Sequence, residues 1–260
     1  MTPPVFFIDI DGVLYSGSQV IEGGPAALEF LRKQHIDFSL VTNTTRMSIA
    51  DIEQHLKNLG YDVSRNEIIT VTEVAAEYLS QQYGTARCFV IGDSSLDECF
   101  IRHNHVVTRQ EESVDVVVLG LSFWSHFGEI DIARRLVERG AEPVALNRDP
   151  TCPDGDWLRI GLGAVVAALE SVISCPITLI GKPNVQYFET VLRRTGYRRE
   201  DTIMIGDSVS VDIAGAAAAG LRSILVRTGA SSKEMMSTEQ DWELSSIAEL
   251  PRWYVENVDR

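Results

Sequence analysis

The chain has 260 residues, of which 45% are hydrophobic and 23% are charged, and its formal net charge at pH 7 is −14. This composition can form a packed core in one large domain or in two modest ones. The negative charge excludes nucleic acid and anionic membranes as expected partners, because both bind basic surfaces. An anionic substrate would therefore need local positive charge from a metal ion or from particular Lys or Arg side chains.

Cellular location is predicted from the N-terminus and the cysteines. Residues 1–4 lack the basic start and the long apolar stretch of a signal peptide, and no apolar run approaches the roughly 20 residues of a transmembrane helix. The four cysteines show neither a C-x-x-C pair nor the spacing of a zinc site. We therefore expect a cytoplasmic protein with reduced thiols.

The first elements along the chain alternate between strands and helices. The hydrophobic run from Val5 predicts a strand that is buried on both faces of a parallel sheet. Helical spacing follows at 26–34, a second strand at 38–42, and another helix at 49–59. This alternation is typical of a parallel α/β sheet.

The same pattern continues beyond residue 72, in a block of about a hundred residues that is large enough for a domain. Within this block, strands are predicted at 87–91, 115–119 and 143–146, and helices at 129–139 and 163–172. After the block, strands are predicted at 177–180, 202–205 and 223–226, and helices at 185–195 and 213–219. We interpret this order as one domain, 1–72 plus 177–260, that is split by an inserted domain, 73–176.

Asp9, Asp11 and Gly12 lie at the C-terminal end of the first predicted strand. Burying two ionised carboxylates two residues apart is costly unless a counter-charge compensates them. Divalent cations take oxygen ligands, and ligands of open α/β sheets bind beyond the carboxyl ends of strands. Alternatively, the motif simply ends the strand in a turn, as Asp and Gly commonly do.

Three further polar groups follow other predicted strands of the same sheet. Thr42 and Asn43 offer a hydroxyl, an amide and loop N–H groups to an anion. Lys182 could neutralise a phosphate oxygen, whereas Asp207 and Asp212 add two carboxylates. Each group also has a structural explanation: an N-cap, a solvated lysine, and an acidic helix start. Because all of them fall at one edge of the sheet, a shared site is the better interpretation.

The order of these motifs resembles the haloacid dehalogenase superfamily of phosphatases. The matching segments are Asp9–Tyr15, Val41–Asn43, Gly181–Asn184 and Gly206–Asp212. The insertion between the second and third segments resembles the type IIA cap of the NagD-like and p-nitrophenylphosphatase-like branch. The resemblance implies an α/β fold with a Rossmann-like doubly wound parallel sheet as the catalytic core and an inserted α/β cap domain. Ser122 and Val211 depart from residues that are frequent in that branch, and the first departure affects contacts of the cap.

The resemblance also implies roles for the core residues. Asp9 would be the nucleophile that forms an aspartyl-phosphate, and Asp11 would act as general acid and base. Mg²⁺ would be the cofactor, held by Asp9, Asp11 and Asp207, and Asp212 would support the site. The residues expected to hold the phosphate are Thr42, Asn43, Thr44, Lys182 and Asn184. A loop of the cap with Asp149, Thr151 and Cys152 would recognise the leaving group.

We therefore expect a Mg²⁺-dependent phosphatase whose partner is a small phosphate ester: a sugar phosphate, a nucleoside monophosphate, phosphoglycolate or pyridoxal phosphate. A haloacid dehalogenase proper would need neither a metal nor an acid at Asp11. A receiver-like switch would be smaller and would lack the insertion. A non-catalytic phospho-ligand sensor on the same fold stays open as an alternative, although sensors tend to lose catalytic groups. A homodimer also stays open.

Three other motifs are interpreted as structural. Gly92–Asp97 imitates the last core motif but has no lysine or paired carboxylate of its own, so we expect a turn and a helix start. Gly161–Val166 lacks the final small residue of a dinucleotide-binding loop. His103 and His105 could bind a metal ion, but the sequence suggests no third ligand.

Overall fold

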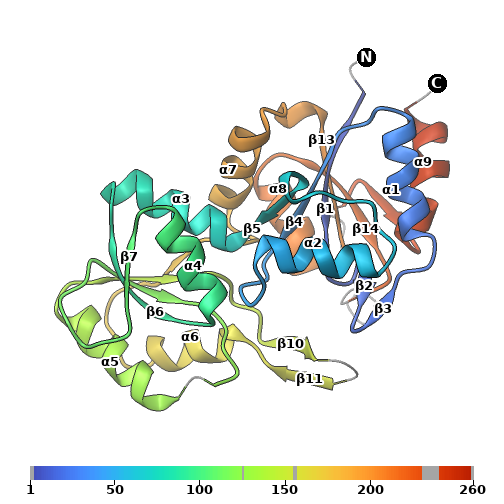
Figure 1. Ribbon diagram of the computed structural model, residues 1–260. Helices are drawn as coiled ribbons and strands as arrows, with labels where there is room; N and C mark the ends of the chain where they lie inside the picture. Colours follow the sequence, from blue (N-terminus) through green and yellow to red (C-terminus); the bar gives the residue numbers. More distant parts are fainter. Residues whose placement is uncertain (1–2, 125, 155–156, 230–239, 259–260) are drawn as a thin grey trace. The chain divides into compact units, whose positions relative to one another are not determined.

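The computed structural model of the chain describes residues 3–124, 126–154, 157–229 and 240–258 (Figure 1). Two compact units divide the chain. The first comprises Met1–Thr42, Ile49–Ile69 and Lys182–Arg260, and the second comprises Asn43–Ser48 and Thr70–Gly181. None of the helices in the described ranges has the length and apolar character needed to cross a membrane.

A six-stranded sheet in the order β15-β14-β13-β1-β4-β5 forms the centre of the first unit (Figure 1). Its strands are β1 (Val5–Asp9), β4 (Phe38–Thr42), β5 (Ile68–Thr70), β13 (Thr202–Gly206), β14 (Arg222–Val226) and β15 (Trp242–Leu244). The pairs from β15 to β4 are parallel. From β1 the chain first extends the sheet through β4 and β5, and later extends it on the other side through β13. Ligands of doubly wound sheets bind beyond the carboxyl ends of the strands at such a reversal.

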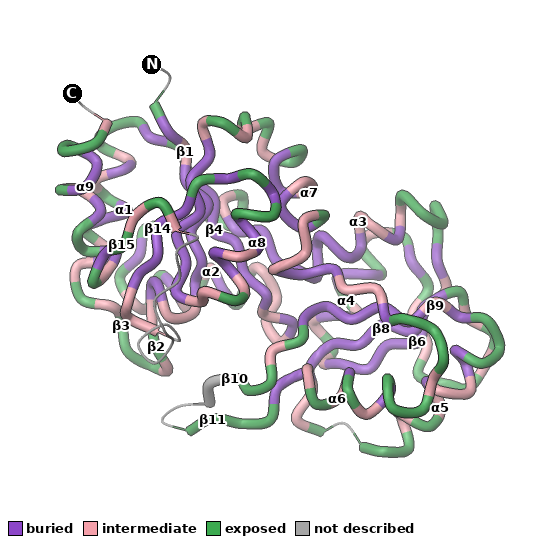
Figure 2. The backbone as a smooth tube through the Cα atoms, turned by 180° about the vertical axis from the view of Figure 1, so that it is seen from behind, coloured by how far each residue is buried: buried purple, intermediate pink, exposed green. Residues whose placement is uncertain are grey.

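The predicted α/β class with a Rossmann-like parallel sheet is confirmed. Hydrophobic runs make the central strands, since four of the five residues of β1 and all five of β4 are buried (Figure 2). The helices of this unit are α1 (Gly24–Lys33), α2 (Ile49–Asn58), α7 (Val185–Thr195), α8 (Ala214–Ala218) and α9 (Leu250–Asn257). Its short elements are the hairpin β2 (Tyr15–Ser16) and β3 (Gln19–Val20), the 3-10 turns η1 (Arg65–Glu67), η2 (Arg199–Asp201) and η5 (Ile247–Glu249), and the π-helical turn η3 (Val209–Ile213).

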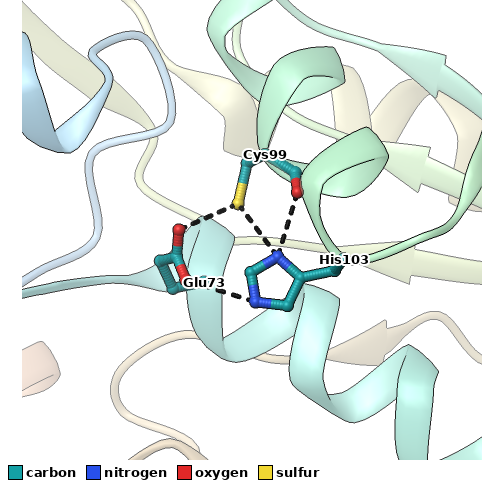
Figure 3. A group of neighbouring side chains, drawn as sticks. All are labelled: Glu73, Cys99 and His103. Atoms are coloured by element: carbon teal, nitrogen blue, oxygen red, sulfur yellow. Dashed lines mark hydrogen bonds and ion pairs between the residues drawn. The ribbon is translucent and has the colours of Figure 1, made fainter.

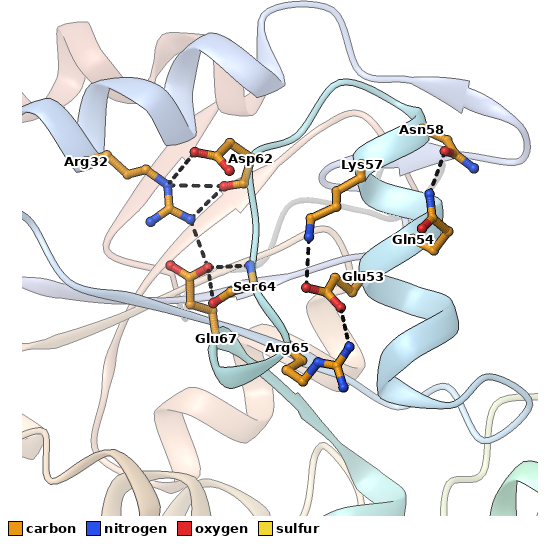
Figure 4. Close-up of polar contacts among 9 residues, drawn as sticks. All are labelled: Arg32, Glu53, Gln54, Lys57, Asn58, Asp62, Ser64, Arg65 and Glu67. Atoms are coloured by element: carbon orange, nitrogen blue, oxygen red, sulfur yellow. Dashed lines mark hydrogen bonds and ion pairs between the residues drawn. The ribbon is translucent and has the colours of Figure 1, made fainter.

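Polar contacts fix the path of the chain between α2 and β5 (Figure 4). Arg32 in α1 donates to the carbonyl oxygen of Asp62 and, at 2.8 Å, to Glu67 Oε2. The same carboxylate accepts from the backbone N–H of Ser64 at 2.8 Å. Ion pairs at a surface contribute at most about 1 kcal/mol each. These contacts therefore direct the loop into β5 more than they stabilise the unit.

A five-stranded parallel sheet in the order β12-β9-β8-β6-β7 forms the centre of the second unit. Its strands are β6 (Arg87–Ile91), β7 (Val106–Thr108), β8 (Val116–Leu119), β9 (Glu142–Ala145) and β12 (Thr178–Leu179). The helices are α3 (Val71–Tyr83), α4 (Ser94–Arg102), α5 (Phe127–Glu138) and α6 (Leu162–Glu170). An antiparallel hairpin of β10 (Thr151–Asp154) and β11 (Trp157–Ile160) completes the unit.

Several features of the second unit differ from the sequence-based expectation. Helix α3 was not predicted; the Thr70 side chain caps it by accepting from Glu73 N. Two of the three residues named for the expected recognition loop, Thr151 and Cys152, lie in strand β10 and pair with β11. The helix start expected within Gly92–Asp97 is confirmed, because α4 (Ser94–Arg102) begins there.

The boundary between the units also differs from the expected one at residue 72. Asn43–Ser48 belongs to the second unit rather than to the first. Two hydrogen bonds explain this: Leu121 N donates to Thr45 Oγ1 at 3.0 Å, and Asn147 Nδ2 donates to the carbonyl oxygen of Asn43 at 2.9 Å.

Candidate active site

Three buried carboxylates meet where β1 and β13 end. Asp9 is the last residue of β1, Asp207 follows β13, and Asp212 lies in the turn η3. Each offers an oxygen within 4.8 Å of the others, and none is more than 7% exposed. The parallel register brings the first two together, because Ile8 lies opposite Ile205 and each is the residue before the last of its strand.

Lys182 supplies a buried cation to this group. Its Nζ lies 2.6 Å from Asp9 Oδ1 and 2.7 Å from Asp212 Oδ1, and it donates to the carbonyl oxygen of Val41 at 3.4 Å. The residue is only 2% exposed. The alternative explanation as a solvated surface lysine is therefore wrong. Asp212 is likewise more than a helix-start residue, since one carboxylate oxygen pairs with Lys182 and the other accepts from Ser208 N.

The electrostatics of the group are those of an unbalanced negative site. Burial raises the pKa of Asp9 well above its ordinary value; Lys182 opposes this shift, whereas the carboxylates of Asp212, Asp207 and Asp11 reinforce it. Burial alone would lower the pKa of Lys182, but Asp212 and Asp9 raise it, so the ammonium group stays charged. Asp9 and Asp212 thus share the ammonium group of Lys182, and the charges of three neighbouring carboxylates act on the buried Asp9, where a bound cation would be stabilising.

The oxygen donors of this group fit Mg²⁺, which is bound by carboxylate and carbonyl oxygens. Two glycines make room beside Asp207. A Cβ atom at Gly229 would lie 1.9 Å from Asp207 Oδ2 and 2.8 Å from the Gly12 Cα, and a Cβ at Gly12 would lie 2.3 Å from the same oxygen. The hydroxyl of Thr228 donates to the carbonyl oxygen of Gly12 at 2.5 Å. The backbone therefore holds the Asp207 carboxylate in one place.

Gly229→Ala is expected to weaken Mg²⁺ binding by at least about 10-fold, as loss of a residue that orients a metal ligand typically does. The added methyl group would displace the Asp207 carboxylate. The effect is measured by titrating each protein with Mg²⁺ and following its melting temperature. The Mg²⁺ concentration at half of the maximal increase in melting temperature is then compared between the variant and the wild type. Gly128→Ala is the matched control, because a Cβ at Gly128 meets nothing within 4 Å. Equal Mg²⁺ dependence of both variants and the wild type would contradict the expectation.

Thr42 lies at the end of β4, beside β1, and is 1% exposed. The N-cap alternative for Thr42 is wrong, because helix α2 begins only at Ile49. Tyr187, which is fully buried in α7, donates to the carbonyl oxygens of Thr42 at 3.4 Å and Ile69 at 3.3 Å. This tyrosine holds the end of β4 in place. The sequence predicted only that it lies in the helix at 185–195.

The remaining predicted residues have other surroundings. Asp11 is half-buried just after β1, and its charge raises the pKa of Asp9. Asn43 and Thr44 belong to the second unit. The Asn184 side chain accepts from Gln186 N at 2.9 Å and caps helix α7. Asp149 and Cys152 are half-buried and Thr151 is exposed, all in the second unit.

Sequence reasoning did not assign roles to Gly229, Thr228 and Tyr187. Thr228 and Gly229 follow β14, so a signal was present: they are a polar and a small residue after another strand of the same sheet. Their contact with Gly12, which is 216 residues from Thr228, could not be derived from local sequence.

Comparison with known proteins identifies the family. The family of haloacid dehalogenase-like hydrolases matches residues 6–105, and the family described as HAD-hydrolase-like matches residues 179–252. The chain is 34% identical to haloacid dehalogenase-like hydrolase domain-containing protein 2 of Bos taurus, over 85% of this chain and 83% of that protein.

Two solved structures are similar over nearly the whole chain. The 4-nitrophenylphosphatase of Thermotoga maritima has a TM-score of 0.89 and 28% identity, covering 96% of this chain and 97% of the other. Glycerol phosphate phosphatase of Mycobacterium tuberculosis, solved in complex with magnesium, has a TM-score of 0.85 and 27% identity, covering 95% and 76%. The chain belongs to the haloacid dehalogenase-like hydrolases. Within them it is a phosphatase of the type IIA branch, which makes it a phosphoric monoester hydrolase.

Proposed function

We propose that this enzyme is a Mg²⁺-dependent phosphatase that hydrolyses a small phosphate monoester through an aspartyl-phosphate on Asp9. The observation that carries the proposal is the buried group of Asp9, Asp207 and Asp212 around Lys182 Nζ. Sugar phosphates, nucleoside monophosphates, phosphoglycolate and pyridoxal phosphate are the substrate classes considered. The similarity to a glycerol phosphate phosphatase and a 4-nitrophenylphosphatase supports a small leaving group.

The carboxylates of Asp9 and Asp207 and the backbone carbonyl of Asp11 would hold the Mg²⁺ ion. When bound, the ion acts as a Lewis acid on a phosphoryl oxygen and offsets the surrounding negative charge. The presence of magnesium in the similar glycerol phosphate phosphatase structure supports this assignment. The charges of Asp212, Asp207 and Asp11, which act on the buried Asp9, support it independently.

The protein's own residues would carry the chemistry in two steps. A carboxylate oxygen of Asp9 attacks phosphorus, the bond from phosphorus to the leaving oxygen breaks, and Asp11 protonates that oxygen. Asp11 then takes a proton from a water molecule that attacks the same phosphorus, which breaks the bond to Asp9 and releases phosphate. Lys182 would offset charge on the transferring group, as such transfers require. Asp212 would position Lys182, to which it lies at 2.7 Å.

The other predicted residues complete the proposal. Thr42, Asn43 and Thr44 would bind the phosphoryl oxygens through hydroxyl and N–H groups. Asn184 would act indirectly by starting helix α7 next to Lys182. The catalytic core would be built on the first unit and the cap on the second, close to the expected division into 1–72 plus 177–260 and 73–176. Asp149, Thr151 and Cys152 of the cap would recognise the leaving group. We also propose a cytoplasmic location, in which buried Cys88 and Cys99 stay reduced.

Release of phosphate from p-nitrophenyl phosphate tests this function. We expect turnover that saturates with Mg²⁺, ceases when EDTA is added, and returns when Mg²⁺ is restored in excess of the chelator. The ion is required because the carboxylates around Asp9 would otherwise repel the phosphate dianion. Undiminished turnover in EDTA would contradict the role of the metal. Saturable binding of phosphate esters without any hydrolysis would instead favour the phospho-ligand sensor.

A further inference from the structure

A second group of metal-binding side chains lies in the second unit, between helices α3 and α4 (Figure 3). Glu73 comes from the first turn of α3, and Cys99 and His103 come from α4 and the residue that ends it. The spacing of four residues places the thiol and the imidazole on the same face of α4. A carboxylate oxygen, a sulfur and a ring nitrogen of these residues all lie within 4.8 Å of one another.

Two distances to the Glu73 carboxylate match the edge of a tetrahedral site. Cys99 Sγ lies 3.3 Å from Glu73 Oε1, and His103 Nε2 lies 3.3 Å from Glu73 Oε2. With zinc–sulfur bonds of about 2.3 Å and zinc–nitrogen or zinc–oxygen bonds of about 2.0 Å, neighbouring ligands are roughly 3.3–3.5 Å apart. The thiol thus lies about one tetrahedral edge from Glu73 Oε1 and the imidazole about one edge from Glu73 Oε2. The thiol lies 4.0 Å from Nδ1 of the same imidazole.

The orientation of His103 also matches that of a metal-bound histidine. Its Nδ1 lies 3.0 Å from the carbonyl oxygen of Cys99, to which it can donate. A metal-bound histidine typically uses one ring nitrogen for the ion and donates from the other to a carbonyl or carboxylate. This hydrogen bond leaves Nε2, which faces Glu73, to hold an ion.

His105 is not part of this group. Its Nδ1 accepts from the backbone N–H of Ala86 at 3.1 Å, so its Nε2 carries the proton that is donated to the carbonyl oxygen of Ala76 at 2.9 Å. The sequence suggested no third ligand for the two histidines, whereas the structure places Glu73 and Cys99 beside His103. The missing partner, Glu73, lies 26 residues before Cys99.

Arg102 competes with an ion for the same carboxylate. Its guanidinium lies 2.5 Å from Glu73 Oε1, but its side chain is 59% exposed. An exposed arginine can move into solvent at little cost. Burial raises the pKa of the Cys99 thiol, and the Glu73 carboxylate adds to this effect, so the metal-free cysteine is protonated. Metal binding would replace that proton, as it does at other thiolate sites.

We propose that Glu73, Cys99 and His103 form a three-ligand site for Zn²⁺ or a similar borderline-soft cation, with a fourth position for water. Sulfur and imidazole donors select such ions, whereas the oxygen-only group around Asp9 suits Mg²⁺. The ion would link α3 to α4 within the second unit. This proposal does not depend on the phosphatase reaction.

Titration with Co²⁺ in place of Zn²⁺ tests the site, because a Co²⁺–thiolate bond gives a charge-transfer absorption that an oxygen-only site cannot give. For the wild-type protein we expect this absorption to saturate at one equivalent and to disappear when Zn²⁺ is added. The absorption should be absent in Cys99→Ser. It should persist in Cys175→Ser, which removes an exposed thiol elsewhere in the unit. A wild-type protein without the absorption, or a Cys99→Ser variant that retains it, would overturn the proposal.

Two milder variants keep the test decisive if Cys99→Ser does not fold. His103→Asn changes a half-buried side chain and is expected to weaken Co²⁺ binding by at least about 10-fold, the smaller effect seen for residues that only orient ligands. Arg102→Gln is expected to tighten binding, because it removes the competing cation from Glu73. If both variants bind Co²⁺ as the wild type does, these residues hold no metal.

Discussion

Asp9→Asn is expected to lower the rate of phosphate release from p-nitrophenyl phosphate by on the order of 10⁴-fold or more, as loss of a covalent nucleophile does in other hydrolases. An amide has nearly the volume of the carboxylate but no charged oxygen with which to attack phosphorus. The fold should be retained, because Asn still fills the position at the end of β1. Initial rates at saturating Mg²⁺, together with urea unfolding curves, measure both effects.

Asp62→Asn is the matched control for this prediction. It makes the same chemical change in the same unit, at a side chain that is 96% exposed, and it should leave the rate unchanged. If Asp9→Asn retained turnover within about 10-fold of the wild type, Asp9 would not be the nucleophile.

Lys182→Met is expected to lower the free energy of unfolding by about 3–5 kcal/mol, the usual result when one partner of a buried ion pair is removed. Asp9 and Asp212 would lose the ammonium group that lies 2.6 and 2.7 Å from them in a region from which water is excluded. Urea denaturation in EDTA measures the loss without contribution from a bound ion. Activity should also fall, because no other described contact supplies an ammonium group to Asp9.

Two companion variants separate charge from packing. Lys57→Met removes an exposed ion pair with Glu53 and should change the free energy of unfolding by less than about 1 kcal/mol. Adding Asp212→Asn to Lys182→Met should restore part of the lost stability, because it removes one of the two uncompensated carboxylates. If the double variant were as unstable as the sum of the two single changes, the loss would reflect packing rather than buried charge.

The convergence of Asp9 and Asp207 was predictable because β1 and β13 are parallel neighbours that present their carboxyl ends at one edge of a sheet. The expectation that Lys182 follows a strand of that same sheet was wrong, because Thr178–Leu179 forms β12, which pairs with β9 in the five-stranded sheet. Hydrophobic runs marked β1 and β13 clearly, and the polar residues came directly after them. The position of Asp212 beside Lys182 was harder to predict. It depends on the π-helical turn η3, which places the Asp212 carboxylate next to the Lys182 ammonium group. Such a turn has no simple sequence pattern.

Contacts between segments far apart in the chain could not be predicted from one sequence. The close approach of Gly229 to Asp207 and Gly12 depends on the position at which β14 ends. Glu73 was missed as a partner of Cys99 and His103 because helix α3 was itself missed. The hairpin of β10 and β11 shows the same limitation on a smaller scale, since neither strand alternates between polar and apolar residues.

In the proposed mechanism, Asp9 carries the phosphoryl group during turnover. Mass spectrometry of Asp11→Asn, quenched with acid during turnover of p-nitrophenyl phosphate, can detect that group. Nitrophenolate leaves without much help from an acid, whereas hydrolysis of the intermediate needs the missing base, so the phosphorylated enzyme should accumulate. We predict one phosphoryl group per chain, on the peptide that contains Asp9 and at that residue. A phosphoryl group on another side chain, or an unmodified peptide while nitrophenolate is being released, would contradict the mechanism.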